Sequence, residues 1–189
     1  MTSRELAVAV DEALVLCPPV RVVCFDWGGT LMADDGPDEV PMCEWPVVEA
    51  IPGARDCLEA LAGLVDVCVA TNAAASSRSM VELALERVDL LRFISRIFCP
   101  VDVGCRKSDP EFWRTVERST GVPLEQTVMI GDSLDGDVIS PARWGVKSIW
   151  FNRDGRAKAP TPAVAIVTLL ADVPGLVVPA LRSRQTRGR

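Results

Sequence analysis

Four sets of polar residues in this sequence could do chemistry. A hard divalent cation such as Mg²⁺ prefers oxygen ligands, and carboxylates that converge on one point need such a cation to offset their repulsion. Ammonium and hydroxyl groups beside it would suit the oxygens of a phosphoryl group. The four sets are Asp26 with Thr30, Thr71 with Asn72, Lys107, and Asp132 with Asp137.

These residue types predict a reaction through a covalent intermediate. An ionised Asp26 can attack an electrophilic phosphorus and give an aspartyl-phosphate, which water then hydrolyses. Lys107 would balance the charge of nucleophile and phosphate, and Thr71 with nearby backbone amides would hold phosphoryl oxygens. Thr30 and Asn72 are further candidates for binding the substrate. The expected metal ligands are Asp26, Asp132 and Asp137, and the expected cofactor is Mg²⁺.

The composition excludes several other classes of site. The sequence has no histidine, which excludes Ser-His-Asp and Cys-His catalysis. Its seven cysteines form no CxxC pair, so a structural zinc site is not expected. A net charge of -6 argues against a nucleic-acid partner. Cys24, Cys68 and Cys99 lie in apolar runs and are interpreted as buried thiols of a protein in a reducing compartment.

Alternating apolar runs and amphipathic segments predict an α/β fold, a three-layer doubly wound parallel sheet. Polar residues that follow parallel strands gather at the carboxyl edge of the sheet, where ligands bind. This edge would bring the four polar sets together. The expected strands are 20–25, 65–70, 96–99, 127–130, 147–151 and 165–167, and the expected helices are 5–16, 54–64, 77–91, 110–120, 134–144 and 169–176.

The length of 189 residues predicts one domain, 1–189, with its core at about 20–176. Residues 5–16 would be a peripheral helix, and the arginine-rich end, about 182–189, a disordered basic tail. Residues 33–52 are expected to form an extended loop that is too short for a substantial cap domain. No leader sequence or membrane span is recognised, which predicts a cytoplasmic protein without membrane binding.

In order and setting, these motifs resemble the haloacid dehalogenase (HAD) superfamily of aspartate-nucleophile hydrolases. The resemblance extends over about residues 20–176 and implies a HAD-like Rossmannoid fold. It implies that Asp26 is the nucleophile, that Thr71 and Lys107 bind phosphate, and that Asp132 is a metal ligand. Asp137 would be a ligand or its support, and the carbonyl oxygen two residues after the nucleophile, that of Gly28, would be another ligand.

One position departs from the phosphatase motif of that superfamily, DxDGT, because this chain has DWGGT at residues 26–30. In the family, the second aspartate protonates the leaving oxygen and then activates water, a role typically worth about 10²- to 10⁴-fold in rate. Gly28 can do neither. The change should therefore slow turnover more than it harms assembly of the site, and Gly28→Asp should raise turnover if the new side chain fits.

Three interpretations stay open. The first is a slow phosphatase, or one that acts on a good leaving group or borrows an acid from Asp34, Asp35 or Glu44. The second is a binding module for a phosphorylated ligand or a protein. The third is a hydrolase of carbon–phosphorus or carbon–halogen bonds, since DWGGT is similar to the DWAGT of phosphonate hydrolases.

Without a cap, the site is expected to be open and covered only by the 33–52 loop or by a neighbouring subunit. This favours a large or exposed phosphorylated substrate, and assembly into a homo-oligomer stays open. Met42 and Trp45 on the loop are expected to pack on the core.

Overall fold

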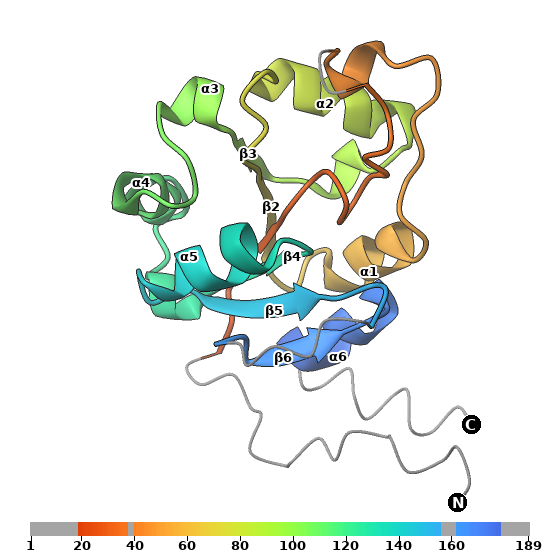
Figure 1. Cartoon of the computed structure of the whole chain (residues 1–189). Coiled ribbons are helices and arrows are strands. Elements are labelled where there is room, and N and C mark those ends of the chain that lie inside the picture. The colour runs from red at the N-terminus through yellow and green to blue at the C-terminus, as the bar shows by residue number, and fades with distance from the viewer. Residues whose placement is uncertain (1–18, 38–39, 156–161, 179–189) are drawn as a thin grey trace, which may run out of the picture.

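A parallel sheet forms the centre of the molecule in the computed structural model, which describes residues 19–37, 40–155 and 162–178. Its six strands are all parallel and lie in the order β3-β2-β1-β4-β5-β6; β4, β5 and β6 lie next to one another in Figure 1. This order confirms the predicted doubly wound sheet. The strands are β1 (Val22–Phe25), β2 (Asp66–Ala70), β3 (Arg96–Phe98), β4 (Thr127–Gly131), β5 (Lys147–Phe151) and β6 (Ala165–Val167).

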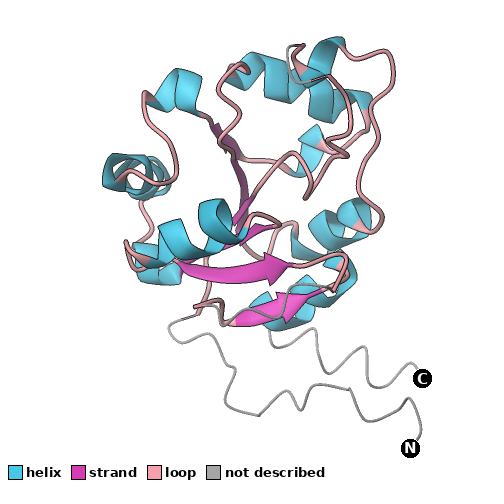
Figure 2. Ribbon diagram, in the orientation of Figure 1, coloured by secondary structure: helices cyan, strands magenta, loops and turns pink. Residues whose placement is uncertain are grey.

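Helices cover both faces of the sheet and give the predicted three layers (Figure 2). On one face, α1 (Ala54–Leu61), α2 (Arg78–Arg87) and α6 (Val173–Val177) contribute to the larger apolar core. On the other face, α4 (Pro110–Thr120) contributes to a second core. The shorter helical segments are η1 (Met42–Glu44), η2 (Leu91–Phe93), α3 (Pro100–Val103), η3 (Leu124–Gln126), η4 (Leu134–Ile139, a π-helix), α5 (Ser140–Ala142) and η5 (Leu170–Asp172).

Strand β1 is apolar throughout because both of its faces are covered. Val23 and Phe25 belong to the larger core, whereas Val22 and Cys24 belong to the second core. Successive side chains of a strand point to opposite faces, so a central strand needs apolar residues at every position. This is why the run before Asp26 could be recognised from the sequence.

The chain reverses its direction of winding between β1 and β4. The strands β2 and β3 lie on one side of β1, and β4 to β6 lie on the other. Ligands of such sheets bind outside the carboxyl ends of the strands at this switch point. Asp26 follows β1 there, its N–H donating to the carbonyl oxygen of Ile130 on β4 at 2.8 Å.

Helix α4 begins and ends at the predicted signals. Asp109 is the N-cap and accepts a hydrogen bond from the N–H of Glu111 at 2.8 Å, and Pro110 opens the helix. Gly121 ends it with a φ of 67°, in the left-handed region that glycine enters at little cost. Lys107 lies three residues before the first residue of this helix and is therefore held close to a rigid element.

Two helix predictions need correction. Helix α1 ends at Leu61, three residues earlier than expected, and Leu64 is exposed, because Gly63 adopts a φ of 75° that stops the helix. Helix α2 spans Arg78–Arg87, not the predicted 77–91, and its N-cap Ser77 makes no side-chain capping bond. The N–H of Arg78 donates instead to Asp102 of α3, at 2.7 Å.

The loop after β1 packs on the core as predicted. Met42 and Trp45 are buried, and the indole N–H of Trp45 donates to the carbonyl oxygen of Val40 at 2.8 Å. Arg87 of α2 donates to three carbonyl oxygens of this loop, those of Cys43, Trp45 and Pro46. One guanidinium group therefore ties η1 to α2.

The predicted helix at 5–16 and the predicted tail at 182–189 lie outside the described residues, so both stay predictions. Within the described ranges, no helix is long and apolar enough to cross a membrane.

Replacing Arg87 with methionine should loosen this loop without disturbing the sheet. The variant loses three hydrogen bonds to carbonyl oxygens, and a net loss of about 1–2 kcal/mol would populate an open loop about 5- to 30-fold more. Limited proteolysis should then cut residues 40–46 faster in Arg87→Met than in the natural chain. The control is Arg114→Met on the exposed side of α4. Equal rates of cleavage of the loop in both variants would contradict the role of Arg87 in holding it.

Candidate active site

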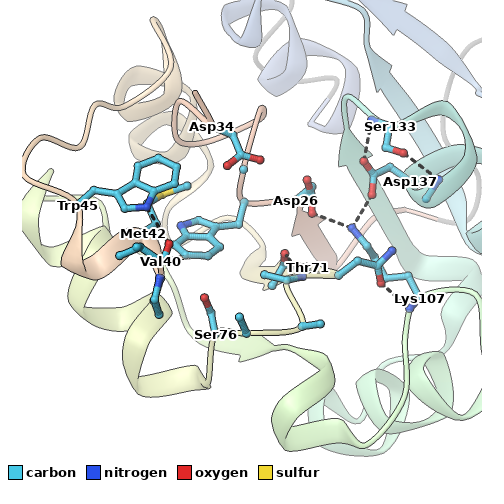
Figure 3. A pocket seen from close by; sticks show the side chains of 18 of the residues that line it. Asp26, Asp34, Val40, Met42, Trp45, Thr71, Ser76, Lys107, Ser133 and Asp137 are labelled. Carbon is cyan, nitrogen blue, oxygen red and sulfur yellow. Dashed lines mark hydrogen bonds and ion pairs between the residues drawn. The ribbon is translucent and has the colours of Figure 1, made fainter. Parts of the chain in front are cut away.

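The ammonium group of Lys107 joins two of the predicted site carboxylates. Lys107 is almost fully buried, with an exposed fraction of 1%. Its Nζ donates to Asp26 Oδ1 at 2.7 Å and to Asp137 Oδ1 at 2.5 Å, as the dashed lines in Figure 3 show. These three side chains come from segments far apart in the sequence, and the switch point of the sheet brings them together.

Two neighbours fix the backbone of Lys107. Its N–H donates to Asn72 Oδ1 at 2.9 Å, and its carbonyl oxygen accepts from the indole N–H of Trp113 at 2.8 Å. Asn72 follows β2 and lines the same cavity as Lys107. The side-chain oxygen of Asn72 therefore positions Lys107. Binding of substrate by Asn72 stays a prediction.

Asp132 follows β4 and is held by Thr30. The Thr30 hydroxyl donates to Asp132 Oδ1 at 3.1 Å, and the Asp132 N–H donates to the same hydroxyl oxygen at 3.1 Å. Thr30 is fully buried and is not among the residues that line the cavity. Thr30 thus positions Asp132, and direct contact of Thr30 with a substrate stays a prediction. Trp150 adds a bond from its indole N–H to the Asp132 carbonyl oxygen at 2.9 Å.

Asp137 lies on the π-helix η4 and is fully buried. Its Oδ2 accepts from the N–H of Ser133 at 3.0 Å, while its Oδ1 faces Lys107. The carboxyl group packs directly against Gly131, where any Cβ would collide with it. Glycine at residue 131 is therefore required by this close approach.

The three carboxylates form a site that fits a divalent cation. One oxygen each of Asp26, Asp132 and Asp137 lies within 4.8 Å of the others. Burial, and then the charge of Asp26, raise the pKa of Asp137 to about 7, and the same causes raise the pKa of Asp132. The protein thus holds more negative charge here than Lys107 offsets, and an all-oxygen donor set of this kind suits a hard cation.

Lys107 stays charged in this setting. Burial lowers its pKa, but the charges of Asp26 and Asp137, together with their hydrogen bonds, outweigh burial and raise the pKa above its ordinary value. Lys107 therefore places a fixed positive charge 2.7 Å from an oxygen of Asp26.

Thr71 stands at the end of β2 and turns its hydroxyl toward a loop. Its Oγ1 accepts from the N–H of Ala73 at 3.1 Å, and Thr71 lines the cavity with residues 73–76. This loop precedes the start of α2 at Arg78. The arrangement offers a hydroxyl beside Asp26, as Figure 3 shows.

The cavity itself has a volume of about 340 Å³ and two unlike sides. Asp26, Thr71, Lys107 and Asp137 line one side. The other side is formed largely by the loop after β1, so a bound molecule would meet charged groups at one end and an apolar surface at the other. The loop residues that line it are Asp34, Pro37, Val40, Pro41, Met42 and Trp45.

The structure therefore gathers Asp26, Thr71, Asn72, Lys107 and Asp137 around one cavity, and Gly28 lines it as well. Asp132 lies next to Asp26 and Asp137. Sequence reasoning missed three supporting residues, namely Trp113, Ser133 and Trp150. No local sequence pattern shows that the indole of Trp113 reaches the carbonyl oxygen of Lys107.

Removing the ammonium of Lys107 should destabilise the protein strongly. Lys107→Met leaves Asp26 and Asp137 facing each other without their shared cation, and breaking a buried pair in this way typically costs about 3–5 kcal/mol. Urea unfolding should show that loss in the free energy of unfolding. Arg114→Met, which removes an exposed arginine, should leave it nearly unchanged, and similar values for the two variants would contradict the central role of the buried pair.

Comparison with known proteins agrees with this geometry. A family model described as haloacid dehalogenase-like hydrolase matches residues 43–145, which is more than half of the chain. The matched region holds Thr71, Lys107, Asp132 and Asp137, and it begins after Asp26.

Two curated relatives are similar over part of their length. Pyrimidine 5'-nucleotidase PynA of Streptococcus pneumoniae is 27% identical over 106 residues, 55% of this chain and 44% of PynA. Putative HAD-hydrolase YfnB of Bacillus subtilis is 29% identical over 113 residues, 59% of this chain and 47% of YfnB. The matches thus span about half the length of these relatives.

Solved structures share the fold over most of the chain. An uncharacterized protein from Listeria monocytogenes superposes with a TM-score of 0.73 at 23% identity, covering 88% of this chain and 99% of that one. YfnB, described as bound to magnesium, superposes with a TM-score of 0.69 at 18% identity, covering 85% and 99%. With the family model and the strand order in agreement, the chain belongs to the haloacid dehalogenase-like hydrolase family.

Proposed function

We propose that this protein is a magnesium-dependent phosphatase that works through an aspartyl-phosphate on Asp26. The observation that carries the proposal is the contact of Lys107 with Asp26 at 2.7 Å, beside two further carboxylates and at the wall of a cavity that also holds Thr71. A nucleophile, a fixed positive charge and a cation site therefore meet at one end of a space that can hold a substrate.

In the first step, an oxygen of Asp26 forms a bond to phosphorus as the ester oxygen departs. Water then attacks the phosphorus, releases inorganic phosphate and restores the carboxylate. Lys107 orients Asp26 by binding one of its oxygens and stabilises the negative charge that the phosphoryl oxygens carry. We assign to Thr71 and the amides of the 73–76 loop the binding of those oxygens.

The donor set fits Mg²⁺, with Asp26, Asp132 and the carbonyl of Gly28 as its proposed protein ligands. When bound, Mg²⁺ would neutralise the carboxylates and polarise the phosphoryl group. Both oxygens of Asp137 already accept hydrogen bonds, from Lys107 and from the Ser133 N–H. We therefore assign Asp137 a supporting role next to the cation, balancing and orienting Lys107.

The names and descriptions of two relatives support this assignment. PynA is named as a pyrimidine 5'-nucleotidase, and the YfnB structure is described as bound to magnesium. The substrate proposed for the present chain is a phosphate monoester whose leaving group packs on the apolar loop side of the cavity, against residues such as Met42 and Trp45.

One observation favours a second candidate, a module that binds a phosphorylated ligand without turning it over. Residue 28 is glycine, so the acid that the family places there is missing, although the contacts that would bind phosphate are present. This candidate predicts tight binding of a phosphorylated ligand and no phosphate release.

The proposed activity predicts phosphate release that needs both Mg²⁺ and Asp26. With 4-nitrophenyl phosphate and acetyl phosphate as substrates, release should fall to background in Asp26→Asn and on chelation of the metal with EDTA. Asp56→Asn on the exposed side of α1 is the matched control and should retain full activity. If the natural chain releases no phosphate from a broad panel of phosphate esters, the proposed phosphatase activity is wrong, and binding of a phosphorylated ligand without turnover is the remaining candidate.

Metal binding predicts a measurable gain in stability. Mg²⁺ at about 100 times its dissociation constant adds about 2.7 kcal/mol, which corresponds to a rise in Tm of about 5–10 °C for a chain of this size. Calorimetry should show this rise for the natural chain and for Asp135→Asn, an exposed neighbour on η4. Asp132→Asn should lose most of it, and an equal rise in all three proteins would place the cation elsewhere.

A further inference from the structure

We propose that Asp34 supplies the acid and base catalysis that Gly28 cannot. The inference rests on the proposed function and adds to it a catalytic residue at an unexpected place in the sequence, eight residues after the nucleophile. Asp34 lines the same cavity as Asp26, Thr71 and Lys107, and Figure 3 shows its carboxyl group on the loop side of that space.

The backbone holds Asp34 in this position. After Asp26 the chain makes a tight turn, in which the Gly29 N–H donates to the Met32 carbonyl oxygen at 2.8 Å and Gly29 has a φ of 75°. The next residue, Ala33, donates its N–H to the carbonyl oxygen of Glu49 at 2.9 Å. Asp34 thus follows a fixed turn that folds back beside residue 28.

The carboxyl group of Asp34 occupies the volume that a side chain at residue 28 would need. A Cβ built on Gly28 would lie 2.6 Å from Asp34 Oδ2 and 2.9 Å from its Cγ. These distances are shorter than non-bonded atoms tolerate, so a side chain at residue 28 would displace the carboxyl group of Asp34 from its present position. The carboxylate of Asp34 therefore lies beside the position where the Cβ of the family's second aspartate would be, although Asp34 itself belongs to the loop.

Other acids in the described residues do not meet the requirements. Only Asp26, Asp34 and Asp137 contribute carboxyl groups to the cavity wall among those residues. Asp26 is the proposed nucleophile, and Asp137 is buried against Lys107 and Ser133. Asp35 lies in a separate depression with Val47 and Glu49, so Asp34 is the remaining carboxylate that lines the cavity and is also exposed.

The proposed steps balance as follows. As Asp26 forms its bond to phosphorus, the bond from phosphorus to the ester oxygen breaks, and that oxygen keeps the electron pair and takes the proton of the Asp34 carboxylic acid. The resulting Asp34 carboxylate then removes a proton from water as the water oxygen attacks phosphorus. Breaking the bond from phosphorus to Asp26 releases phosphate and leaves Asp26 ionised and Asp34 protonated.

This arrangement corrects the expectation for Gly28→Asp. The new side chain would displace the carboxyl group of Asp34, so the single variant exchanges one carboxylate for another and should gain little turnover. It should gain turnover when Asp34 is shortened, because Gly28→Asp with Asp34→Ala frees the volume and returns one carboxylate to it.

The decisive experiment compares Asp34→Asn with Asp35→Asn on two substrates, 4-nitrophenyl phosphate and an alkyl phosphate, at saturating Mg²⁺. In Asp34→Asn, kcat should fall by about 10²- to 10⁴-fold, and kcat/KM should fall more for the alkyl phosphate, whose leaving oxygen needs a proton. Rapid mixing of Asp34→Asn with 4-nitrophenyl phosphate should give a burst of about one nitrophenolate per chain, because the phosphoenzyme still forms but is hydrolysed slowly without the Asp34 base. Asp35→Asn should match the natural chain.

The outcomes separate this inference from the proposed function. If the natural chain releases phosphate and Asp34→Asn does so at the same rate, Asp34 has no such role while the phosphatase stands. If the natural chain releases none, both fail. Recovery of at least tenfold in turnover by Gly28→Asp with Asp34→Ala, relative to Asp34→Ala alone, supports the exchange of one carboxylate for the other. No recovery, with normal circular dichroism and Mg²⁺ binding, would overturn it.

Discussion

The structure depends on one buried ammonium group that lies between two carboxylates. Lys107 reaches Asp26 at the end of β1 and Asp137 on the helix after β4, so it joins the two strands that flank the switch point of the sheet. Two buried acids without this cation would repel each other in surroundings that screen charge poorly. The same contact therefore stabilises the fold and prepares Asp26 for chemistry, and neither role can be changed without the other.

Around this contact, hydrogen bonds from tryptophan and threonine side chains fix the positions of the charged groups. Trp113 holds the backbone of Lys107, whereas Thr30 and Trp150 hold Asp132. Each bond comes from a residue whose own position is fixed in the core or beside the sheet. A metal or a phosphoryl group binding here would meet ligands that are already oriented, which lowers the free energy spent on ordering them.

Most of the fold could be predicted from the sequence, because buried parallel strands are apolar at every position and their ends carry polar residues. The members of the site at those ends, Asp26, Thr71 and Asp132, followed from this rule. The role of Thr30 could not be predicted, since a threonine near a strand end looks the same whether it faces a ligand or another side chain. The position of Asp34 beside Gly28 could not be predicted either, because it depends on a turn that brings the loop back to Gly28. The sequence does not show which of the several loop acids this turn places there.

Three hydrogen bonds from Arg87 to the carbonyl oxygens of residues 43, 45 and 46 attach the loop side of the cavity to α2. Asp26, Thr71 and Lys107 line the cavity from the side of the sheet, whereas Asp34, Met42 and Trp45 line it from the loop. On the proposed function, exchange of apolar loop residues such as Met42 and Trp45 would change which leaving groups fit, while Asp26, Thr71 and Lys107 stay in place. Related chains built in this way would share one chemistry and differ in the molecules that they accept.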